Sequence, residues 1–169
     1  MDYSRLVDVL VVVLLALATV LSLTGPTSPL APILSPLSYE EPTISISDEN
    51  GTELATVDVR VADTDRERYI GLSRTESLSD GEGMLFVHAE SGTYPYVMRN
   101  MAFPIDIVFI DTNGTITTIH HAELPADPSD PQHQYWGEGQ YVLEVPYGWT
   151  NETGIETGDH VSIPESVRP

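Results

Sequence analysis

Apolar residues occupy both faces of one predicted strand, and the rest of the chain can be arranged around it. The stretch Ile105–Ile110 is apolar except for Asp106. Side chains alternate along a strand, and here each face is apolar: Ile105, Ile107 and Phe109 on one, Val108 and Ile110 on the other. This pattern predicts a strand buried on both faces in the middle of a domain. Asp106 is then a carboxylate in apolar surroundings, where a polar group needs a partner.

Alternating patterns predict further strands before and after this one. Thr43–Ser47 and Leu54–Val61 alternate around the turn residues 48–51, which predicts a β-hairpin. Short strands are also predicted at Met84–Val87, Thr115–His121, Gln140–Val145 and His160–Ile163. A turn at Ser91-Gly92 and a surface loop over Glu123–Glu138 are predicted because turn-forming residues gather there.

Two short helical segments complete the predicted domain. Asp63-Thr64-Asp65 offers an N-cap for a helix that reaches Tyr69, and Gly71 can end that helix. A helical turn is predicted within Tyr147–Gly154. Together, the elements predict a mostly β domain with minor α (an α+β fold) over residues 43–165. We expect its sheet to be compact, antiparallel and barrel-like.

The Asn-Gly pair at positions 113–114 predicts a hairpin between the central strand and the next one. A two-residue turn places Asp106 opposite His121, whereas a three-residue turn with a bulge at Gly114 places it opposite His120. Both registers put a histidine across from the carboxylate of the buried strand. Because neighbouring residues point to opposite faces, His120 and His121 cannot contribute to one ligand site on a regular strand.

The first 25 residues have a different pattern from the rest. Val9–Leu23 is uncharged and strongly apolar, and its length lies between a signal-peptide core and a spanning helix. We expect residues 1–25 to be a membrane anchor or signal segment, with residues 6–24 in the cell membrane and the globular domain outside. Secretion after signal cleavage is the alternative. Pro recurs at positions 26, 29, 32, 36 and 42, so residues 26–42 are expected to form an extended linker.

The charge of the chain limits its partners and its setting. The formal net charge is -19, with seven Arg and no Lys. An acidic surface argues against nucleic acid as a partner, because phosphate contacts need Lys and Arg. A hydrophobic content of 41% indicates a folded chain, so the acidity belongs to its surface. Repulsion between surface charges is screened within about 3 Å at 1 M salt, and we therefore expect a halophilic source.

Six short motifs resemble those of one family, in order and in spacing. They are Arg68-x-x-Gly71-Leu72, Gly83-Met84-Leu85-Phe86, Met98-Arg99-Asn100-Met101, Pro104-Ile105-Asp106, Val142-Leu143-Glu144 and Gly158-Asp159. Over about residues 43–163 the chain resembles the domain of unknown function 192 family, as a haloarchaeal-type member. Members usually have Trp at the position of Val97, Lys at that of Arg99 and Met at that of Ser73. The resemblance implies a compact β-rich fold, often exported or membrane-anchored, and it implies no particular activity.

The candidate ligand-binding residues are the polar groups in the most apolar stretches: Arg99, Asp106 and Glu144, with His120 and His121 across from the central strand. In a binding pocket, Arg99 would hold an anionic or polar ligand, and the carboxylates would orient it or act as a general base. In a structural role, the same residues would form a buried network that fixes the strand register. The sequence predicts no metal ion or other cofactor, because the histidine spacing matches no known cluster.

Three functions are compatible with these observations. We prefer a membrane-anchored, extracytoplasmic module that binds an unknown small ligand or an envelope protein. The alternatives are an enzyme with a small polar site, and a structural envelope protein. An enzyme predicts that Arg99, Asp106 and Glu144 converge on one concave site with a shifted carboxylate pKa. If the chain is exported, the sequons at Asn50, Asn113 and Asn151 are candidates for glycosylation.

Overall fold

The central strand is buried on both faces, as predicted. The computed structural model describes residues 39–127 and 133–169. In it, strand β4 (Ile105–Ile110) lies between β5 (Ile116–Ala122) and β6 (Tyr135–Pro146), and all six of its residues are buried. Side chains of β4 contribute to two apolar clusters: Ile105, Ile107 and Phe109 to one, Val108 and Ile110 to the other.

Seven strands form one sheet in the order β5-β4-β6-β3-β2-β1-β7. The remaining four strands are β1 (Thr43–Ser47), β2 (Glu53–Ala62), β3 (Glu82–Tyr96) and β7 (His160–Val161). Neighbouring strands are antiparallel except β2 and β3, which are parallel. The expectation of a wholly antiparallel sheet is therefore wrong at this pair. Parallel neighbours need a crossover connection, and here the connection contains helix α3 (Asp65–Ile70).

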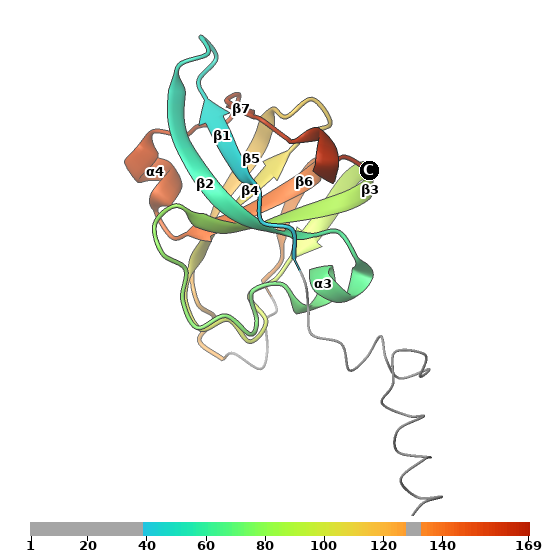
Figure 1. Cartoon of the computed structure of the whole chain (residues 1–169). Coiled ribbons are helices and arrows are strands. Elements are labelled where there is room, and N and C mark those ends of the chain that lie inside the picture. The colour runs from blue at the N-terminus through green and yellow to red at the C-terminus, as the bar shows by residue number, and fades with distance from the viewer. Residues whose placement is uncertain (1–38, 128–132) are drawn as a thin grey trace, which may run out of the picture. The chain divides into compact units, whose positions relative to one another are not determined.

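The sheet curls until its two edges meet, which gives a mostly β half-barrel with few helices (Figure 1). Thr115, just before β5, forms a bridge with His160 of β7. The backbone N–H of Val161 donates to the carbonyl of Gly114 at 2.7 Å. A Cβ on Gly114 would lie 2.5 Å from the carbonyl oxygen of Val161, so this contact requires glycine.

Strands β3 and β6 are longer than predicted. The turn expected at Ser91-Gly92 lies within β3, where the pairing with β6 shifts register between Val87 and Gly92. The loop expected over Glu123–Glu138 already ends where β6 begins, at Tyr135. The glycines in β6 indicated a loop, but they serve close packing: a Cβ on Gly137 would lie 2.2 Å from the Phe109 ring.

Both predicted helical segments are present, and Figure 1 shows them on opposite sides of the domain. Helix α3 starts with a capping box: the Thr64 hydroxyl accepts from the Glu67 N–H, and the Glu67 carboxylate accepts from the Thr64 N–H. Gly71, with φ of 49°, ends it. Helix α4 (Trp149–Thr153) lies between two left-handed glycines, and η1 (Glu165–Val167) is a short 3-10 helix near the C-terminus.

The β4–β5 hairpin combines the two predicted registers. Its tip is a three-residue turn, in which the Asp111 N–H donates to the Thr115 carbonyl at 2.9 Å. The register then shifts between Phe109 and Ile110, so that Asp106 lies opposite His121. The bulge therefore combines the turn of one register with the histidine partner of the other.

The predicted membrane span over residues 6–24 lies outside the described residues, as does most of the predicted linker over 26–42. Within residues 39–127 and 133–169, no helix is long and apolar enough to cross a membrane.

Candidate functional site

A cavity of about 420 Å³ lies between helix α3 with its following turn, strand β3 and the segment after β3. Its aromatic lining comes from Tyr69, Phe86, Tyr94 and Tyr96, and its charged or ionisable lining includes Asp65, Arg68, Arg99 and Glu144. The volume falls in the range typical of small-molecule sites, which are mostly apolar with a few polar groups.

Glu144 reaches this cavity from the middle of β6. It lies opposite Met84 on β3 and Ile107 on β4, and its side chain is only 6% exposed. In the part of the chain that the structure describes, no side chain pairs with the Glu144 carboxyl and no group donates a hydrogen bond to it. Burial alone raises the pKa of Glu144 from 4.5 to about 8. At neutral pH the cavity therefore presents a carboxylic acid that can donate a hydrogen bond.

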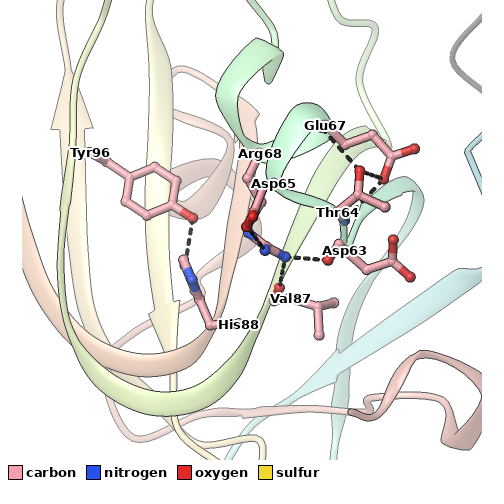
Figure 2. A network of polar contacts seen from close by, with 8 residues as sticks. All are labelled: Asp63, Thr64, Asp65, Glu67, Arg68, Val87, His88 and Tyr96. Carbon is pink, nitrogen blue, oxygen red and sulfur yellow. Dashed lines mark hydrogen bonds and ion pairs between the residues drawn. The ribbon is translucent and has the colours of Figure 1, made fainter. Parts of the chain in front are cut away.

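Besides Glu144, the cavity is lined by two further neutral polar groups, His88 and Tyr96, both on β3 (Figure 2). The Tyr96 hydroxyl and His88 Nε2 share a hydrogen bond of 3.1 Å, and the His88 ring stacks on Tyr94 at 3.7 Å between centroids. Burial, and then the charge of Arg68, lowers the pKa of His88 to about 4. Burial, and then Glu144, raises the pKa of Tyr96 well above 10. Both groups are therefore uncharged at neutral pH.

Arg68 fastens helix α3 to β3 beside the cavity, as Figure 2 shows. Its guanidinium donates to the carbonyl of Val87 at 2.7 Å, to the carboxylate of Asp65 at 2.6 Å and to the carbonyl of Asp63. The Asp65 carboxylate thus balances the charge of Arg68. Arg68 holds the cavity wall in place, and these bonds use three of its five N–H donors.

Arg99 lies near the mouth of the cavity. Its Nη2 donates to the carbonyl of Tyr69 at 2.6 Å, and its guanidinium carbon lies 4.1 Å from the centroid of the Tyr69 ring. Tyr69 is 70% exposed. Stacking on an aromatic ring orients a guanidinium while leaving other N–H groups free to bind an anion.

Asp106 belongs to a different part of the molecule. It is fully buried, and its carboxylate accepts hydrogen bonds from His121 Nδ1 at 2.7 Å, from the Gly148 N–H at 3.0 Å, and from both the N–H and the hydroxyl of Thr150 at 3.0 and 2.7 Å. Three of these four donors come from α4 and its N-cap Gly148 and join the helix to the central strand, whereas His121 comes from β5. A fully hydrogen-bonded carboxylate of this kind acts as framework.

The structure brings two of the five predicted site residues together at the cavity, Arg99 and Glu144. Asp106 lies opposite Val145, the neighbour of Glu144 on β6, so the two carboxylates point to opposite faces of the sheet. His121 faces Asp106, and His120 Nε2 contacts the carbonyl of Trp136 at 2.8 Å. The convergence of Arg99, Asp106 and Glu144 that an enzyme predicts is therefore not observed.

Sequence reasoning missed Arg68, His88 and Tyr96 as members of the cavity. His88 and Tyr96 lie eight residues apart on one strand, but the turn predicted at Ser91-Gly92 separated them. Arg68 was visible as part of a family motif, without an indication of its contacts. Among residues 39–127 and 133–169, no group of three or more His, Cys, Asp or Glu is arranged to hold a metal ion.

The fold and the cavity define a curled, mostly β half-barrel domain with one aromatic pocket beside its short helix α3. The model of DUF192, a family described as an uncharacterised ACR, matches residues 46–163, and the chain belongs to this family. No curated protein matches the chain.

Two solved structures are similar to this chain. One is a proposed transcription regulator from Sinorhizobium meliloti 1021, with a TM-score of 0.69 and 26% identity over 76% of this chain and 97% of that one. The other is a protein of unknown function from Novosphingobium aromaticivorans DSM 12444, with a TM-score of 0.65 and 25% identity over 82% of this chain and all of that one. They support the half-barrel fold.

We predict that Asp106→Asn destabilises the protein by roughly 3 kcal/mol, because an amide turns an N–H₂ group toward donors and removes the charge that they stabilise. Asp111→Asn is the matched control. Asp111 accepts from the N–H groups of Asn113 and Thr115 in the nearby turn, where asparagine is also accepted. Chemical unfolding at constant salt measures both. If both variants lost the same small amount of unfolding free energy, Asp106 would not be a framework residue.

We predict that the stability of the protein depends on pH through Glu144. Its folded pKa of about 8 exceeds the ordinary value of 4.5, so the folded state binds more protons between these values. The free energy of unfolding should therefore fall as pH rises from about 4.5 to about 8. In Glu144→Gln this contribution is absent. The free energy of unfolding of the variant, relative to that of the wild type, should therefore rise by about 2 kcal/mol or more between pH 4.5 and pH 8.

Unfolding curves of both proteins at pH 5, 6.5 and 8 provide the test. The depressed pKa of His88, about 4 in place of 6.5, contributes the opposite slope between those two values. That contribution is common to both proteins and cancels in the difference. A difference that stays constant with pH would contradict a buried, unpaired Glu144.

Proposed function

We propose that this domain is a binding module for a small ligand, and that the ligand occupies the cavity at Glu144. The observation that carries the proposal is a carboxyl that is 6% exposed, lines a cavity and has no partner among the described residues. No fully buried side-chain oxygen or nitrogen of the described residues lacks a hydrogen bond, so the Glu144 carboxyl is open to the cavity, where a ligand can reach it. A ligand can supply the missing partner, and the aromatic lining supplies apolar contact area.

A structural role alone explains the cavity less well. A network that served only to fix the fold would have all its polar groups satisfied, as Asp106 has. Glu144 lies in the same sheet and contributes no such bond. Its position instead favours a function that is realised when a second molecule is present.

Nucleic acid is not the ligand that we propose. The name of the Sinorhizobium protein refers to transcription regulation, but this chain has a net charge of -19. Neutralising phosphates requires a surface rich in Lys and Arg. Of the seven arginines, Arg68 lines the cavity with its charge already paired to Asp65, and Arg99 lines it near the mouth.

The test is native mass spectrometry of the full chain, purified from its own source in high salt. We expect the wild type to carry a small molecule that Glu144→Gln loses. Glu138→Gln is the matched control, because Glu138 is exposed on the same strand and lies outside the cavity lining. A wild type with a clean apo mass, or equal occupancy in both variants, would contradict the proposal.

We further propose that residues 6–24 anchor the domain to the outer face of the cell membrane of a halophile, with residues 26–42 as spacer. The apolar run and the acidic, lysine-free composition support this placement. Fractionation of source cells should place the full-length chain in the membrane fraction, where external protease reaches the domain in intact cells. A shortened chain in the medium would instead indicate signal cleavage.

A further inference from the structure

We propose that the cavity binds a zwitterionic ligand of the amino acid class, with its ammonium group against Glu144 and its carboxylate against Arg99. The inference rests on the proposed binding function and specifies the ligand. It follows from how the charges around the cavity are paired, and from which of them are left over.

Of the four Asp, Glu and Arg side chains that line the cavity, two form an ion pair with each other. Arg68 Nη2 lies 2.6 Å from the Asp65 carboxylate. The remaining two, Arg99 and Glu144, have no oppositely charged partner among the described residues. With Glu144 ionised, the lining as a whole carries no net charge. A ligand without net charge, but with separated charges, matches such a lining.

Arg99 and Glu144 are separate poles and do not form an ion pair with each other. Burial raises the pKa of Glu144, and none of the ion pairs among the described residues involves its carboxylate. An anionic ligand would match Arg99 but would leave Glu144 as a neutral acid without an ion pair. A cationic ligand would match Glu144 but leave Arg99 without one. A zwitterion satisfies both poles.

The chemistry at each pole fits the group that we assign to it. An ammonium group has three N–H donors and no acceptor, and the Glu144 carboxylate supplies the acceptor that a buried ammonium requires. The rings of Phe86, Tyr94 and Tyr96 line the same cavity and can add cation–π attraction. Arg99 is held by Tyr69 and offers a planar donor fork to a carboxylate.

Binding should release a proton, because an ammonium group stabilises Glu144 in its charged form. The titratable and charged groups that line the cavity with Glu144 are His88, Tyr94 and Tyr96 from β3, Asp65, Arg68 and Tyr69 from α3, and Arg99 from the segment after β3. The shifted pKa values of His88 and Tyr96 keep both neutral at pH 7. Glu144 is thus the group whose protonation changes on binding.

The experiment is isothermal titration calorimetry of the full chain with each of the twenty free proteinogenic amino acids, at pH 7 in high salt. The tightest binder is then compared with its two analogues that lack either the ammonium or the carboxylate. We expect at least one amino acid to bind, and each analogue to bind at least about tenfold more weakly. Repeating the titration in two buffers with different ionisation enthalpies should show close to one proton released.

Two variants assign the poles. Glu144→Gln should lower the affinity for the amino acid to that for its deaminated analogue, with no proton release. Arg99→Gln should lower the affinity for the amino acid to the affinity for its decarboxylated analogue, and binding should still release a proton. Glu138→Gln should bind as the wild type does. A variant that binds the amino acid and both analogues more weakly by the same factor would indicate loss of structure. That result would overturn the assignment of the substituted residue.

The inference is overturned if none of the twenty amino acids binds, or if an analogue with one pole binds as tightly as the amino acid. Its failure can be distinguished from failure of the proposed function. A co-purified molecule that is not a zwitterion, and that Glu144→Gln loses, would leave a binding module with another ligand. A clean apo mass together with no amino acid binding would contradict both.

Discussion

Burial of the central strands on both faces is the constraint on which the rest of this structure depends. Every residue of β4 is buried, and its side chains reach two apolar clusters that lie on opposite faces of the sheet. A polar group in such a strand must be satisfied within the protein, because water does not reach it. Asp106 meets this condition with four donors, of which three tie α4 and its N-cap to the strand and one, His121, comes from β5.

The same constraint makes Glu144 informative. It lies on β6, beside β4, in equally apolar surroundings, yet its pKa of about 8 reflects burial without a compensating partner. Two carboxylates on neighbouring strands thus have opposite characters, one fully hydrogen-bonded and one unpaired next to a cavity. The difference follows from the register, since Asp106 pairs with Val145 and not with Glu144. Structural need explains the first carboxylate, whereas a ligand best explains the second.

Local pattern predicted the elements that depend on local chemistry. The two-sided apolar pattern of Ile105–Ile110, the N-cap before α3 and the Asn-Gly turn at 113–114 correspond to features of the structure. The local pattern gave wrong predictions where contacts between residues distant in the sequence determine the structure. Gly137 and Gly139 resemble loop residues, but they allow β6 to pack against Phe109 and Ile110. Arg99 and Glu144 were found as polar residues in apolar stretches, whereas separating Glu144 from Asp106 required the pairing of β4 with β6.

The central claim is that Glu144 is a protonated, unpaired acid in the ligand-free protein and becomes charged when a ligand binds. Its side-chain carboxyl carbon, labelled with ¹³C, reports this state directly in an NMR titration of the ligand-free protein. We predict a titration midpoint near 8 that moves to lower pH when ligand is added. A midpoint near 4.5, the ordinary value for glutamate, would show that Glu144 is already solvated or paired, and would contradict the account.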